Sequence, residues 1–198
     1  LYRPKHNLPA QTTPFVGRET ELTELGKLLN NSKVRLITIV AQGGMGKTRL
    51  ALELAEQALT PSTAPKARGE IVDFKDGTYF VELAPLSDPT NIVGAIADAT
   101  SYQFQSDKRD QKQQVLDFLG NKNILLVLDN YEHLLEGAAL ATDMLKAASN
   151  VKILATSRQR LNQLSETIFN LQGMGFPTWE TPADALEYAA VKLFMQSA

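Results

Sequence analysis

The sequence predicts an α/β domain built on an open parallel β-sheet. Short apolar, β-branched runs alternate along the chain with longer segments of helical periodicity. One such run, residues 124–128, is apolar without interruption, which is typical of a central parallel strand buried on both faces. Another, residues 36–40, leads directly into a glycine-rich turn and a helix-forming run. Together these features predict one sizeable α/β core.

Composition narrows the class of protein further. The 198 residues carry a net charge of −2, so there is no electrostatic case for a nucleic-acid or membrane partner. The absence of cysteine excludes a disulfide framework and a thiolate metal site. No apolar run approaches the roughly 18 residues of a membrane span, and no signal peptide is visible. Because the chain begins at Leu1 and stops within a helical pattern, we expect it to be part of a longer cytoplasmic protein.

The first third of the chain is expected to contain an arm, two helices and a strand. Residues 1–13 are polar and contain prolines, which favours an extended arm. A helix is expected over residues 20–29, because Leu22, Leu25, Leu28 and Leu29 share one face. The strand 36–40 and the helix 49–56 flank the glycine-rich turn, and residues 60–69, rich in Pro, Ser and Ala, predict a loop.

Four further strands and four further helices are expected after residue 75. The strands are predicted at residues 78–83, 124–128, 151–155 and 167–171. The helices are predicted over 91–99 with Thr90 as N-cap, from 106–109 to Gly120, from Asp129 to about Ser149, and from Thr181-Pro182 onward. The basic residues near position 108 are expected to face solvent, with a nucleic-acid patch as the alternative.

The glycine-rich turn, residues 41–48, has the features of a phosphate-binding loop. Gly43, Gly44 and Gly46 allow successive backbone N–H groups to turn inward around an anion, at the positive end of the helix that follows. Lys47 supplies a full charge for the β- and γ-phosphates, and the Thr48 hydroxyl is a hard oxygen ligand for Mg²⁺. The pattern usually begins with glycine, and here Ala41 takes that place. If that position needed a positive φ, alanine would cost about 1–2 kcal/mol, but we expect the loop to remain intact.

Two strands end in polar residues that the sheet should bring to this loop. Asp129 follows the strand 124–128, and ligands of open parallel sheets lie outside the carboxyl ends of the strands. We therefore expect Asp129 to hold Mg²⁺ together with Thr48, with a helix-capping aspartate as the alternative. Arg158 follows the strand 151–155 and could contact a phosphate oxygen, or could be an ordinary surface arginine.

Hydrolysis needs a group that orients or deprotonates water. Asn130 stands directly after Asp129 and can orient water, but it cannot take a proton. Glu132 is the nearest carboxylate, either as a substitute base or as an acid that favours the dipole of the following helix. His133 is expected to be a surface or packing residue.

The chain as a whole resembles a known class. The motifs that carry the resemblance occur in order: Phe15-Val16-Gly17-Arg18-Glu19, the phosphate loop, residues 79–86, residues 125–134 and Ala155-Thr156-Ser157-Arg158. This pattern is similar to the STAND class of signal-transduction ATPases, and in particular to the NB-ARC-like ATPase modules of AfsR- and LuxR-type bacterial transcription regulators. The resemblance covers nearly the whole chain from about residue 8.

The resemblance implies a fold and a set of site residues. The fold would be a P-loop NTPase of the ASCE type, a three-layer α/β/α arrangement with five parallel strands in the order 5-1-4-3-2. Residues 14–175 would form this ATPase domain, and residues 176–198 the start of a helical domain. The resemblance implies adenine contact by Val16, Gly17 and Arg18, triphosphate and Mg²⁺ binding by Lys47 and Thr48, a metal-associated acid at Asp129 and detection of the γ-phosphate by Arg158. Together with the residues themselves, this gives the full set of expected site residues. Nucleotide binding is expected for Val16, Gly17, Arg18, Gly43, Gly44, Met45, Gly46, Lys47, Thr48 and Arg49, Mg²⁺ binding for Thr48 and Asp129, and catalytic roles for Lys47, Asp129, Glu132 and Arg158.

The leading functional hypothesis is an adenine-nucleotide switch that binds ATP or ADP with Mg²⁺ and hydrolyses ATP slowly. The resemblance implies a closed ADP state and an ATP state that favours homo-oligomers, in a parent chain that also carries a winged helix and sensor repeats. One alternative is an initiator-like or AAA+ working ATPase that acts on DNA. Another is a degenerate module that binds nucleotide poorly and serves in protein interaction.

Overall fold

The computed structural model describes residues 5–59 and 73–173. Five strands form a single parallel sheet in the order β2-β3-β4-β1-β5. The strands are β1 (Leu36–Val40), β2 (Gly77–Glu82), β3 (Ile124–Asp129), β4 (Lys152–Ser157) and β5 (Glu166–Asn170). The predicted parallel sheet and its strand order are therefore confirmed. The bounds of β1 are as predicted, and those of the other four strands differ from the predicted ones by one or two residues.

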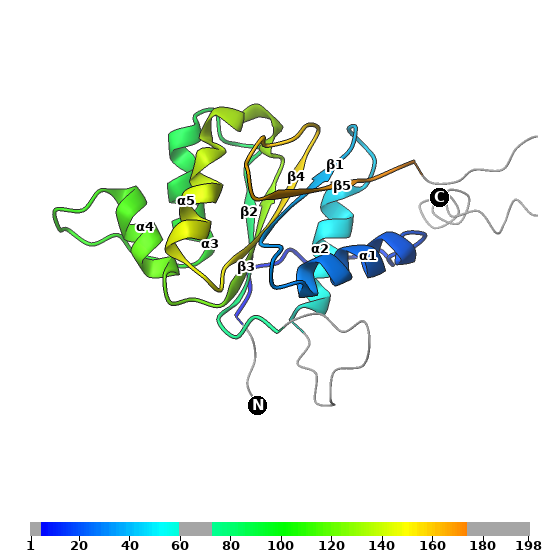
Figure 1. The fold of residues 1–198 in the computed structure, drawn as a ribbon, viewed down its shortest axis with the longest axis horizontal. Coiled ribbons are helices and arrows are strands. Elements are labelled where there is room, and N and C mark those ends of the chain that lie inside the picture. Colours follow the sequence, from blue (N-terminus) through cyan, green and yellow to red (C-terminus); the bar gives the residue numbers. More distant parts are fainter. Residues whose placement is uncertain (1–4, 60–72, 174–198) are drawn as a thin grey trace, which may run out of the picture.

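Helices cover both faces of the sheet, as Figure 1 shows. The helices are α1 (Glu19–Asn30), α2 (Lys47–Gln57), α3 (Ile92–Ala99), α4 (Gln111–Leu119) and α5 (Ala139–Ala147). One apolar core lies between the sheet and α3, α4 and α5, and a second lies between the sheet and α1 and α2. The result is the expected three-layer arrangement.

Strand β3 contributes to both cores because successive side chains of a strand point to opposite faces. Ile124, Leu126 and Leu128 belong to the core beneath α3, α4 and α5, whereas Leu125 and Val127 belong to the core beneath α1 and α2. All six residues of β3 are buried, which explains its uninterrupted apolar sequence. At its carboxyl end the last buried residue is Asp129, so the strand carries a carboxylate to the rim of the sheet.

The arm before α1 lies along the open edge of β2. His6 pairs with Thr78 in a parallel bridge. The Asn7 amide accepts a hydrogen bond from the Phe80 N–H at 2.7 Å and donates one to the Phe80 carbonyl at 2.8 Å. This side chain therefore replaces one backbone pair of a further strand, and the predicted extended arm covers an edge that would otherwise be unpaired.

Two helix starts differ from the predictions because an aspartate, and not the predicted residue, caps the first free N–H groups of the turn or helix. Thr90 is not the N-cap of α3, since the Asp88 carboxylate accepts from the Thr90 N–H at 2.8 Å and begins a 3₁₀ turn, Pro89–Asn91. The helix predicted to begin at residues 106–109 begins at Gln111, because the Asp110 carboxylate accepts from the Gln113 N–H at 2.7 Å. Aspartate is among the best N-cap residues, so both shifts have a local cause.

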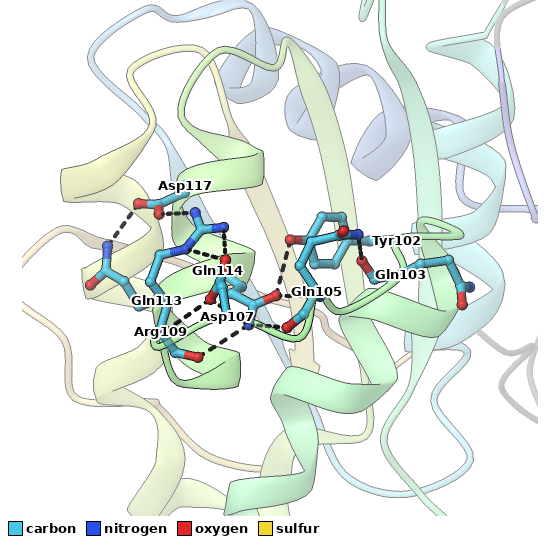
Figure 2. Close-up of polar contacts among 8 residues, drawn as sticks. All are labelled: Tyr102, Gln103, Gln105, Asp107, Arg109, Gln113, Gln114 and Asp117. Atoms are coloured by element: carbon cyan, nitrogen blue, oxygen red, sulfur yellow. Dashed lines mark hydrogen bonds and ion pairs between the residues drawn. The ribbon is translucent and has the colours of Figure 1, made fainter.

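The segment 101–110 is a loop organised by the side chains of Gln114, from α4, and of its own Arg109 (Figure 2). Gln114 is buried, and its amide accepts from the Gln105 N–H at 2.8 Å and donates to the Gln105 and Arg109 carbonyls at 3.1 Å. The Arg109 guanidinium pairs with the carboxylates of Asp107 and Asp117. These pairs neutralise the charge of Arg109, which is consistent with a solvated surface.

The chain after Asp129 is the largest departure from the predicted elements. Instead of a helix to about residue 149, two 3₁₀ turns, Tyr131–His133 and Leu135–Gly137, precede α5. Asn130 adopts a left-handed conformation with φ 68° and ψ 49°, which is incompatible with a helix that starts there. The predicted apolar positions are nevertheless buried or half-buried: Leu134, Leu135, Ala138, Ala141, Met144, Leu145 and Ala148.

Two predictions, the loop over residues 60–69 and the helix that opens at Thr181-Pro182, lie outside the described residues. Among the residues that the structure describes, no helix is long and apolar enough to cross a membrane.

Candidate functional site

The site lies where β1, β4 and β3 end side by side. Register pairs Val40 of β1 with Ser157 of β4, and Leu128 of β3 with Ala155 of β4. The residues that follow each strand therefore emerge at one edge of the sheet, the edge at which parallel α/β sheets bind ligands. The phosphate loop, Arg158 and Asp129 come from these three strand ends.

The phosphate loop presents backbone donors in the geometry of an anion-binding nest. Gly44 and Gly46 have φ values of 76° and 82°, and Gly46 directly precedes α2. The N–H groups of residues 42–48 have no hydrogen-bond acceptor in the described part of the chain. Ala41 is not among the residues with positive φ, so it carries no strain, and its N–H donates to the Ser157 carbonyl at 3.3 Å.

Lys47 lies within the loop with its ammonium held by two loop carbonyls. Its Nζ donates to the carbonyls of Ala41 at 2.9 Å and Gln42 at 3.1 Å. The residue is 7% exposed. A buried ammonium next to unpaired N–H groups makes this part of the site strongly positive, which favours a polyanion.

The Asp129 carboxylate faces the loop across the site. Its Oδ1 accepts hydrogen bonds from Thr48 Oγ1 at 2.8 Å and from Thr156 Oγ1 at 2.6 Å. Thr156 Oγ1 in turn accepts from the Asn130 N–H at 3.0 Å. The structure thus places Asp129 next to Thr48, as the sequence predicts for a shared Mg²⁺ site, and not as the cap of a helix.

Thr156 is a site residue for which the sequence analysis assigned no role. It lies on β4, between β1 and β3, and it orients both Asp129 and the backbone of Asn130. The available signal was a hydroxyl at the carboxyl end of the strand just before Arg158. Only the strand order shows that this hydroxyl lies beside Asp129.

Arg158 lies over the phosphate loop. The position of a Cβ at Gly43 would be 3.6 Å from Arg158 Nη2 and 3.7 Å from Arg158 Cζ. The Nε of Arg158 forms an ion pair with Glu132 Oε1 at 3.0 Å. Lys47, Thr48, Asp129, Glu132 and Arg158 are therefore brought to one edge of the sheet, although the pairing of Arg158 with Glu132 was not predicted.

The segment before α1 approaches the loop through Arg18. Val16 and Gly17 are half-buried, and Arg18 is 4% exposed. The Arg18 guanidinium pairs with Glu21 at 2.5 Å and donates to the Met45 carbonyl at 3.4 Å. Arg18 therefore ties the residues expected to contact adenine to the phosphate loop.

Arg49 makes a second connection between this segment and the site. Its Nη2 donates to the Thr13 carbonyl at 2.8 Å, and its Cζ lies 5.5 Å from the centre of the Phe15 ring. A guanidinium over an aromatic face is a favourable cation–π arrangement. In this structure Arg49 contacts the segment 13–15 and pairs with Glu53 at 3.4 Å, and none of these partners among the described residues belongs to the phosphate loop.

The His133 ring is hydrogen-bonded to backbone carbonyls. Its Nε2 lies 3.1 Å from the Leu83 carbonyl and 2.9 Å from the Leu86 carbonyl, both just after β2. Carbonyls only accept, so this nitrogen carries the proton and donates. The residue is exposed and its ring anchors the turn after Asp129, in agreement with the surface or packing role expected for it.

The donor set fits Mg²⁺ only together with a ligand. In residues 5–59 and 73–173, no group of three or more His, Asp or Glu side chains could hold a metal ion by itself. Mg²⁺ is usually bound by one or two protein oxygens, with phosphate oxygens and water completing the octahedron. Thr48 Oγ1 and Asp129 Oδ1, 2.8 Å apart beside unpaired N–H donors, match that need.

The strand order and the loop after β1 together define the class of protein, a P-loop NTPase fold of the ASCE type. Residues 30–171, most of the chain, match the AAA domain family. The chain therefore belongs to the AAA domain family.

Relatives in sequence include regulators. The chain is 33% identical over 165 residues to a candidate HTH-type transcriptional regulator of Mycobacterium tuberculosis, covering 83% of this chain and 16% of that protein. It is 29% identical over 168 residues to the regulatory protein AfsR of Streptomyces griseus, covering 80% of this chain and 16% of AfsR. The chain thus spans a small part of these relatives, and the predicted likeness to AfsR is confirmed.

Solved structures support the fold. Cdc6p from Pyrobaculum aerophilum has a TM-score of 0.53 at 17% identity, covering 88% of this chain and 48% of that one. A STAND protein with a tetratricopeptide repeat sensor from Pyrococcus horikoshii has a TM-score of 0.50 at 15% identity, covering 84% of this chain and 24% of that one. At these identities the likeness concerns the fold alone.

Proposed function

We propose that this domain binds ATP and ADP with Mg²⁺ and hydrolyses ATP slowly, as a switch within a larger regulatory protein. The observation that carries the proposal is the 2.8 Å hydrogen bond between Thr48 Oγ1 and Asp129 Oδ1. It joins the phosphate loop to a strand-end carboxylate 81 positions away in the sequence. A glycine-rich turn of no function would not need that partner.

Different residues would contact the phosphates, the Mg²⁺ ion and the adenine of the nucleotide. The N–H groups of residues 42–48 would surround the β-phosphate, and Lys47 would move from its loop carbonyls to the β- and γ-phosphates. Thr48 and Asp129 would hold Mg²⁺, which neutralises phosphate charge when bound. Val16, Gly17 and Arg18 would lie against the adenine, because Arg18 keeps this segment beside Met45.

Slow ATP hydrolysis is expected because the residue after Asp129 is Asn130. Asn130 has an amide, which can orient water but cannot accept its proton. Its left-handed backbone, φ 68°, is a conformation that asparagine tolerates better than most residues do. The local sequence is thus suited to a nucleotide that is retained, not rapidly consumed.

The regulatory context is part of the proposal. The relatives at 33% and 29% identity are named as regulators, and the matched part is 16% of each. We assign residues 14–175 to the ATPase domain, residues 1–13 to its arm and residues 176–198 to the start of a helical domain of the NB-ARC type. Nucleotide exchange would then alter how this domain contacts other domains or a second copy.

The test is to identify and titrate the nucleotide. The purified chain is denatured and the released nucleotide is identified by chromatography, and affinities for ATP and ADP are measured by calorimetry with and without Mg²⁺. Lys47→Ala should lower nucleotide affinity by at least about tenfold, because charged hydrogen bonds contribute about 1.5–3 kcal/mol each. Lys108→Ala, which removes an exposed lysine of the 101–110 loop, is the matched control.

Each outcome has a distinct reading. Equal affinity in the two lysine variants would refute the assignment of the phosphate loop. A chain that binds no nucleotide would favour a pure interaction module. Rapid turnover stimulated by DNA would favour a working ATPase over a switch.

A further inference from the structure

The two side chains of the Arg158–Glu132 ion pair differ in how far they are exposed to solvent. The Glu132 side chain is 15% exposed and its Oε2 is buried without a hydrogen-bond partner among the described residues. The Arg158 side chain is 62% exposed. An enclosed carboxylate therefore holds a cation that reaches outward over the phosphate loop.

Glu132 is fixed because both of its neighbours are anchored. Tyr131 is fully buried, and its hydroxyl donates to the Gly137 carbonyl at 3.1 Å. The His133 ring donates to the Leu83 and Leu86 carbonyls after β2. The 3₁₀ turn that carries Glu132 is thus fastened on both sides, and the carboxylate cannot easily follow a moving partner.

The contact with Glu132 uses only one part of the guanidinium. The ion pair joins Oε1 to Nε at 3.0 Å. The terminal nitrogens Nη1 and Nη2 have no hydrogen-bond partner in residues 5–59 and 73–173, and Nη2 lies 3.6 Å from the position that a Cβ at Gly43 of the phosphate loop would take. A guanidinium can bind a phosphate through two parallel N–H groups while its Nε–H is engaged elsewhere.

We infer that Glu132 is a positioning residue that holds Arg158 by its Nε and turns the Nη1/Nη2 edge toward the γ-phosphate of ATP. This inference rests on the proposed function, because it assumes a nucleotide on the phosphate loop. It replaces the two roles that the sequence left open for Glu132, a base for water and an acid at a helix start. The ion pair and the phosphate contact can exist together, so ATP does not have to break one to form the other.

Deleting the negative charge of Glu132 tests this role, because the expected change in ATP affinity is opposite to the purely electrostatic one. Deleting a carboxylate close to a bound polyphosphate should, by relief of Coulomb repulsion alone, strengthen ATP binding. If Glu132 positions Arg158, the deletion should weaken ATP binding instead, because the free guanidinium swings through many rotamers and loses its alignment. The sign of the effect separates the two explanations.

The experiment compares dissociation constants for Mg²⁺-ATP and Mg²⁺-ADP across variants of the 198-residue chain. Arg158→Ala should lose about tenfold in ATP affinity and leave ADP affinity within about twofold, since only ATP has the γ-phosphate. Glu132→Ala should reproduce most of that loss, and Glu132→Gln should restore most of it, because an amide oxygen still accepts from Nε–H. Glu136→Ala, an exposed glutamate of the next 3₁₀ turn, should change neither constant.

The double variant is the decisive measurement. Glu132→Ala combined with Arg158→Ala should lose no more ATP affinity than Arg158→Ala alone, because the two residues act through one contact. Additive losses would overturn the inference. Tighter ATP binding in Glu132→Ala, or lost turnover in both Glu132 variants with unchanged affinities, would overturn it as well.

Two controls keep the result interpretable. If Glu132→Ala does not fold, Arg158→Lys takes its place, because lysine lacks both the Nε–H that Glu132 holds and the planar fork that this contact would orient. Arg158→Lys that keeps the full preference for ATP would refute the positioning role. A wild-type chain that binds neither nucleotide would refute the proposed function itself, whereas unchanged variants of a chain that binds both would refute only the role of Glu132.

Discussion

The left-handed glycine before α2 is a feature whose energetic value the structure allows us to calculate. Gly46 has φ 82°, and a Cβ added there would meet nothing within 4 Å. Gly46→Ala therefore meets no other part of the described structure, and its native-state cost is that of the left-handed backbone conformation, about 1–2 kcal/mol. Gly43 is the matched control, because it lacks a positive φ and its added Cβ would lie at ordinary contact distances from Arg158, 3.6 to 3.9 Å.

The comparison of the two variants removes the contribution of the unfolded chain. Gly→Ala restricts the unfolded chain to the same degree at both positions, so this effect cancels in the difference. We expect Gly46→Ala to be less stable than Gly43→Ala by about 1–2 kcal/mol. For a domain of this size that corresponds to roughly 2–8 °C in Tm.

Thermal denaturation without nucleotide is the appropriate assay, with urea unfolding as a check that the m-value is unchanged. Equal melting temperatures for the two alanine variants would refute the reasoning, because they would mean that the loop does not need the left-handed conformation at Gly46. Gly44, with φ 76° and nothing near its added Cβ, should behave like Gly46 and provides an independent repeat.

Two further predictions concern the turn after β3. Asn130→Ala should destabilise the chain by about 1 kcal/mol and Asn130→Gly should not, because only alanine resists φ 68°; equal stability by urea denaturation would contradict this. Burial raises the pKa of the Tyr131 phenol, whose usual value is about 10. Since the unfolded chain ionises its tyrosines at lower pH than folded Tyr131 does, the free energy of unfolding should fall as the pH rises above about 10, by up to about 1.4 kcal/mol per pH unit. Tyr131→Phe should make that fall shallower in urea denaturation at high pH, and an equally steep fall in the variant would show that Tyr131 is not its source.

Local patterns were sufficient for much of the fold. The strands lie within one or two residues of their predicted bounds, because each is a short apolar run between turn residues. Patterns failed where capping competes with periodicity. Asp88 and Asp110 begin their turns and helices earlier or later than the apolar spacing indicates, and Asn130 prevents a helix that the apolar spacing favours.

The candidate site also has some features that the sequence predicts and one that depends on the tertiary structure. The phosphate loop is a local feature, because residues 41–48 are neighbours in the chain and a strand, a glycine turn and a helix are sufficient to recognise it. That Asp129 meets Thr48 could be expected from the general geometry of parallel sheets. The pairing of Glu132 with Arg158 could not, because it depends on the left-handed turn at Asn130 that no periodicity predicts.

By itself, the sequence determined that this chain forms a parallel α/β core with an anion cradle after its first strand, because both are signalled by patterns of residues close in the chain. Only the tertiary structure decided which strand ends lie together. The order β3-β4-β1 places Thr156 of the middle strand beside Asp129, and brings Arg158 over Gly43. The physical reason is that strand order and turn geometry are set by packing across the two faces of the sheet, between side chains far apart in the sequence.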